Sequence, residues 1–122
     1  MASEPPVPSH AYRLFTTTEW DAVVAAGAFT GTALDTRDGF IHLSLPSEVR
    51  STCAAYFRGT TLVLARVALA GLRTRNDFVA SRNAWFPHVL DLNIPLCAFE
   101  LPPTALPWSE AAAAHEGFPD GF

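Results

Sequence analysis

Two histidines stand inside apolar, aromatic segments and are the residues of this chain best suited to acid–base chemistry. His42 lies in DGFIHLS, residues 38–44, and His88 lies in FPHV, residues 86–89. Imidazole titrates close to neutral pH, so a pair of histidines can supply one acid and one base at pH 7. The remaining two histidines, His10 and His115, lie in the N-terminal leader and the C-terminal tail, and we expect no catalytic role for them.

His42 is placed by the alternation of side chains along a strand. Asp38-Gly39 is a turn signal, and the five residues after it alternate as a half-buried strand does. The alternation puts His42 on the same face as Phe40 and Ser44. That face is either the core, with His42 as a hydrogen-bonded core residue, or the wall of a cleft.

His88 follows a proline, which restricts the backbone and would hold the imidazole in one pose, as catalysis requires. The alternative is a turn histidine that forms a hydrogen bond with the backbone.

A metal site built from His42, His88 and either Asp77 or Asp91 would have the ligands of a facial triad. Nothing in the spacing of these residues favours it, and we predict no metal and no cofactor.

Composition narrows the classes of function. The chain has 122 residues, enough for one domain, and a net charge of −4 with scattered basic residues, which argues against nucleic acid or a membrane as partner. No apolar run reaches 18 residues, so the sequence predicts no membrane-spanning helix. All eight basic residues are arginine, which excludes a P-loop and any lysine nucleophile. Cys53 and Cys97 lack metal spacing and are expected to be buried, reduced thiols of a cytoplasmic protein.

The pattern predicts one α+β domain in which two helices pack on a small sheet. We expect a disordered leader over 1–10, a single domain over 11–101 and a proline-rich C-terminal tail over 102–122, with a short helix over 109–116. The predicted strands are 11–15, 40–44, 60–69 and 97–101, and the predicted helices are 19–26 and a second within 45–59. The segments 28–39 and 72–96 carry no clear period.

Caps set the helix ends. Thr18 with Asp21 three residues later approximates a capping box for the first helix, and Gly27 is a suitable residue to end it. Ser47 can cap the second helix, and Gly59 can end it.

Several motifs together resemble the family known as domain of unknown function 952. The segments EWDAVVAAGAFTGTALD, DGFIHLS, YFRGTTLVLARV, ASR and FPH follow one another in the order and spacing of that family, over residues 12–99. The resemblance implies an ADP-ribosyltransferase-like fold, in which two small sheets form a cleft that holds NAD in the active members. It places the strand with His42 on that cleft and supplies His88 as its partner.

Two positions depart from the family pattern. A glutamate usually precedes the ASR motif, and here that position is Val79. The tyrosine that follows FPHL in the family is also replaced, because the order here is Val89-Leu90-Asp91. Asp77 lies two residues before Val79, on the same face of a strand and about 7 Å away. A valine at the acidic position weighs against NAD chemistry.

The predicted site has two catalytic residues, His42 and His88. The predicted substrate-binding residues are aromatic, small or basic side chains near the two histidines: Tyr12, Phe40, Ser44, Phe78, Val79, Arg82 and Trp85. Arg82 can bind a carboxylate or a phosphate through two hydrogen bonds, whereas Arg73 and Arg75 are expected to be solvated.

Three functions remain open. The first is a small cofactor-independent enzyme, of the lyase or isomerase type, that cyclises, dehydrates or isomerises an organic small molecule, for instance in a biosynthetic pathway. The second is an NAD-dependent ADP-ribosyl-type transferase, and the third is a binding module without catalysis. The expected partner is a small molecule, and a homodimer is left open.

Overall fold

The computed structural model describes residues 4–49, 51 and 62–106, and it shows an α+β fold with small antiparallel sheets. In chain order the elements are β1 His10–Thr16, α1 Thr17–Ala26, β2 Ala28–Phe29, α2 Ala33–Asp38, β3 Ile41–His42, η1 Pro46–Glu48, β4 Leu62–Ala68, β5 Thr74–Val79, β6 Ala84–Val89, β7 Ile94–Pro95, η2 Leu96–Ala98 and β8 Thr104–Leu106. In the described part of the chain, no helix has both the length and the apolar character needed to cross a membrane.

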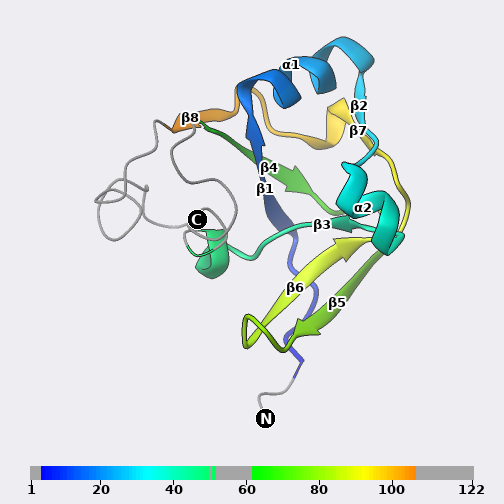
Figure 1. Ribbon diagram of the computed structural model, residues 1–122, viewed down its shortest axis with the longest axis vertical. Helices are drawn as coiled ribbons and strands as arrows, with labels where there is room; N and C mark the ends of the chain where they lie inside the picture. The colour runs from blue at the N-terminus through cyan, green and yellow to red at the C-terminus, as the bar shows by residue number, and fades with distance from the viewer. Residues whose placement is uncertain (1–3, 50, 52–61, 107–122) are drawn as a thin grey trace.

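Two three-stranded sheets form the frame, and two small sheets are what the family resemblance implied. One has the order β1-β4-β8 and the other β3-β6-β5, and β2 and β7 form a small third pair. Among the described residues, one bridge connects β1 with the segment that follows β3: Tyr12 N donates to Ser44 O over 2.9 Å, and Ser44 N donates to Tyr12 O over 2.8 Å. Figure 1 shows β3 leading from the hairpin β5–β6 toward β1.

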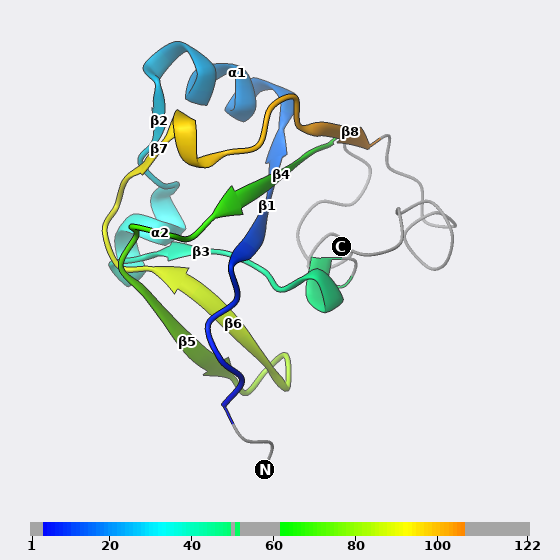
Figure 2. The same cartoon turned by 180° about the vertical axis from the view of Figure 1, so that it is seen from behind.

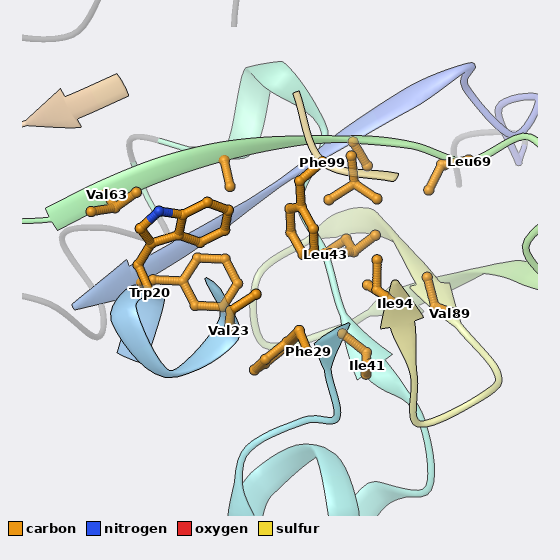
Figure 3. Packing of buried hydrophobic residues seen from close by; sticks show 14 residues of the cluster. Trp20, Val23, Phe29, Ile41, Leu43, Val63, Leu69, Val89, Ile94 and Phe99 are labelled. Carbon is orange, nitrogen blue, oxygen red and sulfur yellow. The ribbon is translucent and has the colours of Figure 1, made fainter. Parts of the chain in front are cut away.

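The core lies between α1, the β1–β4 pair and the strand that carries His42. Phe15 packs edge-on against Phe29 and Phe99. Trp20 packs against Phe99 in the same way, and Figure 3 shows these two side chains in the core with Phe29 and Ile41. Ile41 is fully buried in this cluster. Burying side chains of this size contributes roughly 1.5–3 kcal/mol each, so the core fixes which face of the 40–44 strand points inward.

The first helix begins earlier than the sequence suggested. Thr16, not Thr18, is the N-cap: its hydroxyl accepts from Glu19 N, and the Glu19 carboxylate accepts from Thr16 N. Both contacts make a complete capping box, which the pair Thr18 and Asp21 only approximates. Gly27 ends the helix with φ of 77°, as predicted.

A second helix lies where no regular structure was expected. α2 occupies part of the segment 28–39 and has its own capping box, formed by Thr32 and Asp35. Gly39 ends it in the left-handed conformation, with φ of 84°. The helix has only six residues, which is too short for an apolar period to be visible. The helix predicted within 45–59 begins here as the 3-10 turn Pro46–Glu48, and most of it lies outside the described residues.

The segment 72–96, which lacked a period, contains the hairpin β5–β6. Side chains alternate between the two faces of these strands, but both faces carry aromatic and polar residues. The sequence therefore does not show the alternation of apolar and polar residues that identifies a half-buried strand. Pro87 lies in the middle strand of its sheet and accepts from Leu43 N over 3.1 Å. Because a proline has no N–H to return that bond, the ladder between β3 and β6 is short.

The end of the domain also differs from the expectation. Residues 97–101 were predicted as a strand, but Leu96–Ala98 is a 3-10 turn and only Phe99 forms a bridge, to Val67. The turn exposes Cys97, which was expected to be buried, whereas Cys53 lies outside the described residues. The strand β8 lies within the range assigned to the tail.

The N-terminal segment follows the hairpin before it enters β1 (Figure 2). Asn76 Nδ2 of β5 donates to Pro5 O over 2.8 Å, and Leu69 N donates to Ser9 O over 2.9 Å. These contacts connect part of the predicted leader with the domain.

Candidate functional site

A cavity of about 500 Å³ opens between the two larger sheets and is closed on one side by α2. Its walls come from β1, α2, the 40–44 segment and the hairpin β5–β6. The segment 40–44, of which Ile41–His42 is strand β3, contributes Phe40, His42 and Ser44, the face that the alternation had set apart, and Leu43 also reaches the wall. Ile41 and Leu43 point into the core, with exposures of 0% and 2%. His42 is therefore a cavity residue with a buried apolar strand behind it.

The register of β3 against β6 places the two histidines directly opposite each other. His42 pairs with His88, and their ring centroids are 5.0 Å apart in an edge-to-face arrangement. Both line the cavity. Two residues that lie 46 positions apart in the sequence (88 − 42) are thus brought together, and a small molecule in the cavity can reach both imidazoles.

His42 has a carboxylate at each ring nitrogen. Nδ1 lies 2.6 Å from Asp35 Oδ1, and Nε2 lies 2.9 Å from Asp38 Oδ2. Carboxylates accept hydrogen bonds, so an imidazole that satisfies both partners at once carries a proton on each nitrogen. The His42 side chain is 30% exposed, and this exposure faces the cavity.

Asp35 organises the deeper part of the site. It is fully buried, and it accepts from both Nη atoms of Arg13 over 3.1 Å and from the His42 backbone N over 3.0 Å. Thr32 N and Thr32 Oγ1 donate to it over 2.7 and 2.9 Å. Burial alone would raise the pKa of Asp35, but the hydrogen bonds from His42 and the charge of Arg13 outweigh burial and lower that pKa below its usual range. Asp35 is therefore a carboxylate at neutral pH and fixes the orientation of His42.

Arg13 links the carboxylate to the core and to β3. Its Nη1 also donates to His42 O over 2.8 Å, and its guanidinium lies 4.9 Å from the centre of the Phe29 ring. The side chain is 14% exposed. Arg13, the charged residue of the otherwise apolar strand 11–15, thus positions Asp35 and His42 and also packs against the edge of the core.

His88 is oriented by a different acid. Its Nδ1 lies 2.6 Å from Asp77 Oδ2, and the residue is 3% exposed. Arg75 Nε donates to both oxygens of Asp77, over 2.9 and 3.2 Å. Burial lowers the pKa of His88; the hydrogen bond to Asp77 opposes burial, and the neighbouring His42 adds to the lowering. His88 is therefore neutral at pH 7, with its proton on Nδ1.

The second nitrogen of His88 faces the cavity side of the site without a hydrogen-bond partner among the described residues. No residue in the described ranges forms a hydrogen bond with Nε2, and His88 lines the cavity. The carboxylate–imidazole pair of Asp77 and His88 leaves a basic lone pair on Nε2, as in the base of a catalytic triad. This is the arrangement of a general base.

Phe40 holds the His88 ring from one side. The two rings are stacked, with centroids 4.3 Å apart and an angle of 16° between their planes. Phe40 also contacts the ring of His42, at 4.8 Å, and the guanidinium of Arg75 lies 5.5 Å from its centre. Arg75, which was expected to be solvated, is exposed but is also part of this stack.

Most of the residues that the sequence suggested for binding lie in the cavity wall. Those in the wall are Tyr12, Phe40, Ser44, Val79 and Arg82. Arg82 donates through Nη2 to Ser51 Oγ over 2.8 Å, and its guanidinium lies 4.9 Å from the centre of the Phe86 ring. The site therefore has an apolar side formed by Phe86, Val79 and Phe40.

Phe78 and Trp85 lie elsewhere. They are cross-strand partners in β5–β6, with rings 5.4 Å apart, and neither is in the wall of the cavity. The hairpin register explains this, because Asp77 and Phe86 pair on one face and Phe78 and Trp85 on the opposite one. Phe78 is 36% exposed.

The acids of the site were the residues that sequence reasoning missed. Asp35 and Asp38 lie in a segment read as irregular, and Asp77 was considered only as a metal ligand or as a replacement at the position of Val79. A signal for Asp35 exists in the sequence, because Thr32 and Asp35 have capping-box spacing. In the described ranges, no group of three or more His, Cys, Asp or Glu side chains could hold a metal ion. Asp91 instead pairs with Arg73 at the surface, Nη2 to Oδ1 over 2.8 Å.

The fold and the cavity define a small α+β protein with a pair of carboxylate-bound histidines between two sheets. The model of the family described as "Protein of unknown function (DUF952)" matches residues 14–100, and the chain belongs to this family.

The chain is also similar to protein CC0527 from Caulobacter crescentus. The crystal structure of that protein is 32% identical with a TM-score of 0.73, over 83% of this chain and 89% of that chain. Its solution NMR structure is 33% identical with a TM-score of 0.67, over 85% and 90% of the two chains. No curated protein matches this chain.

Proposed function

We propose that this protein is a small cofactor-independent enzyme that moves a proton on an organic substrate, with His88 as the general base and His42 as the hydrogen-bond donor or acid. The observation that carries the proposal is the open Nε2 of His88, whose Nδ1 is held by Asp77 over 2.6 Å. A neutral imidazole with an oriented lone pair in a cavity is suited to remove a proton at pH 7. His42, held between two carboxylates, is suited to the opposite role.

The proton balance of such a reaction closes within the site. His88 Nε2 takes a proton from a carbon next to a carbonyl, and the electron pair moves onto the carbonyl oxygen. That oxygen replaces Asp38 at His42 Nε2 and accepts its hydrogen bond. In an isomerisation, His88 returns the proton to a different carbon. In a dehydration, the electron pair returns and expels a hydroxyl group, which leaves as water with the proton from His88. Either path restores both imidazoles to their starting states.

We also infer that the fold is ADP-ribosyltransferase-like, supported by the two small sheets joined through Tyr12 and Ser44 with a cavity between them. The wall, however, has Val79 where the resemblance calls for a glutamate. Asp77, on the same face, is engaged by His88 and Arg75. This favours proton transfer by histidine over chemistry on NAD.

The test is hydrogen exchange on a panel of small carbonyl compounds and β-hydroxy acids in D₂O, followed by NMR. We expect wild-type protein to accelerate exchange next to the carbonyl of at least one compound, and His88→Gln to lower that rate by a factor of about 100 or more. His10→Gln is the matched control, because His10 is outside the cavity wall, and it should leave the rate unchanged.

Two other results would replace the proposal. A compound that binds but does not exchange indicates a binding module. A rise in the melting temperature with millimolar NAD, and no exchange with any compound, indicates the transferase, because a ligand that binds only the native state stabilises it.

A further inference from the structure

The two histidines of the cavity have the same kind of partner at Nδ1 and different surroundings at Nε2. Each has its Nδ1 2.6 Å from a carboxylate oxygen, of Asp35 for His42 and of Asp77 for His88. The Nε2 atoms then differ. His88 Nε2 has no hydrogen bond from the described residues, whereas His42 Nε2 lies 2.9 Å from Asp38 Oδ2. The carboxylate of Asp38 thus sits at the position from which a ligand would meet His42.

Asp38 is held in a different way from the two orienting acids. It lies in the last turn of α2, where the helix ends at Gly39, and its side chain is 28% exposed. A carboxylate is unfavourable at the negative end of a helix. Its contacts are with the exposed Arg37, Nε to Oδ1 over 2.9 Å, and with His42. Hydrogen bonding to Arg37 lowers the pKa of Asp38, so the group is an anion at neutral pH.

We propose that Asp38 occupies, in the free protein, the place of a carboxylate on the ligand, and that the ligand is a small carboxylic acid with an apolar body. This rests on the proposed function, because it takes the cavity as the substrate site. When Asp38 turns into solvent, His42 Nε2 and the guanidinium of Arg37 are left facing the cavity. The apolar body then lies against Leu34, Phe40 and Phe86.

Charge balance favours one negative charge on the ligand. Arg13 is neutralised by Asp35, and Arg75 is neutralised by Asp77. The other charged side chains of the wall are Arg37 and Arg82 against Glu19 and Asp38, two of each sign. Displacing Asp38 therefore leaves one net positive charge in the wall, and the cationic group it uncovers beside His42 is Arg37. A monoanionic, planar carboxylate matches both the charge and the shape of the group that it replaces. A phosphate dianion would bring an excess of negative charge.

The experiment uses benzoate as the probe and benzamide as its neutral isostere. The full-length protein is titrated with each, and the imidazole ¹⁵N resonances of His42 and His88 are followed by NMR. We expect benzoate to shift the Nε2 resonance of His42 saturably, and benzamide or inorganic phosphate to have no such effect. Asp38→Asn keeps an oxygen acceptor but removes the competing charge, and it should bind benzoate about fivefold more tightly.

Asp91→Asn is the matched control. Asp91 is an exposed aspartate paired with an arginine, and it is not in the cavity wall. We expect its benzoate affinity to stay within about twofold of the wild type, because its charge is screened by solvent. Equal affinities in the Asp38→Asn and Asp91→Asn proteins would overturn the inference, as would a failure of benzoate to shift His42. If the melting temperature shows that Asp38→Asn is unfolded, Asp38→Ser supplies the same comparison.

His88→Gln separates this inference from the proposed function. Retained benzoate binding with lost hydrogen exchange supports both. Exchange by the wild type without benzoate binding removes only the carboxylate site. Benzoate binding without exchange of any compound keeps the carboxylate site and removes the catalytic role.

Discussion

Replacing Asp35 with asparagine should destabilise the protein strongly. The carboxylate accepts two hydrogen bonds each from Arg13, Thr32 and His42. It is fully buried, with an exposure of 0%. An asparagine can accept only through one oxygen, and its NH₂ group would face donors. It also leaves the guanidinium of Arg13 without its counter-ion in a site that is 14% exposed. Breaking a buried pair in this way costs about 3–5 kcal/mol.

Chemical and thermal denaturation followed by circular dichroism measure this loss. For a domain of this size, about 3 kcal/mol corresponds to a fall in the melting temperature of about 12 °C. The loss should depend on pH in a defined direction. The pKa of Asp35 is lowered by folding, so its contribution is fully present above the unfolded value of 3.8 and is lost as pH falls through the lower folded value. The difference between wild type and Asp35→Asn should therefore shrink below about pH 4.

Two controls identify the cause. Asp91→Asn removes an exposed, arginine-paired carboxylate and should cost at most about 1 kcal/mol. Adding Arg13→Met to Asp35→Asn should cost less than the sum of the single changes, because it removes the unpaired charge. If Asp35→Asn is as stable as Asp91→Asn, the assignment of Asp35 as the organising carboxylate is wrong.

Two further predictions follow from the caps and from the electrostatics of the site. Thr16→Ala should lower the free energy of unfolding by about 1 kcal/mol, and Thr18→Ala by less than about 0.5 kcal/mol, measured by urea denaturation; equal losses would contradict the assigned cap. By NMR titration the pKa of His88 should be below 6.5 in the wild type. It should be lower still in Asp77→Asn, which loses a hydrogen bond that raises the pKa, and higher in His42→Gln, which loses a charge that lowers it. A shift of the pKa in the same direction in both variants would refute the electrostatic account.

Part of the fold could be read from local sequence. Alternation along residues 40–44 separated the buried Ile41 and Leu43 from the cavity face of His42, because a strand's side chains alternate whatever packs on either side. The strand 60–69 and the end of the first helix at Gly27 were likewise predicted. The true cap at Thr16 could have been found too, since Glu19 stands three residues after it.

Other parts could not be read in this way. α2 is too short to show a period, and it is held by the contacts of Asp35 with Arg13 and His42. The hairpin β5–β6 has Phe86 among the cavity residues of one face and Phe78 and Trp85 on the other. Because aromatic residues occur on both faces, its pattern is not that of a half-buried strand. For the same reason Phe78 and Trp85 were grouped with the cavity residues although they lie on the far face.

The sequence by itself determined the histidine pair, the face on which His42 lies and the α+β class, because each depends on short-range geometry or on residue type. Only the tertiary structure decided that His42 and His88 are cross-strand partners and that Asp35 and Asp77 hold their Nδ1 atoms. It also decided that Asp38 covers one of the two outward nitrogens. These contacts depend on the register between strands far apart in the chain, and register is fixed by the packing of the whole core and not by any local run of residues.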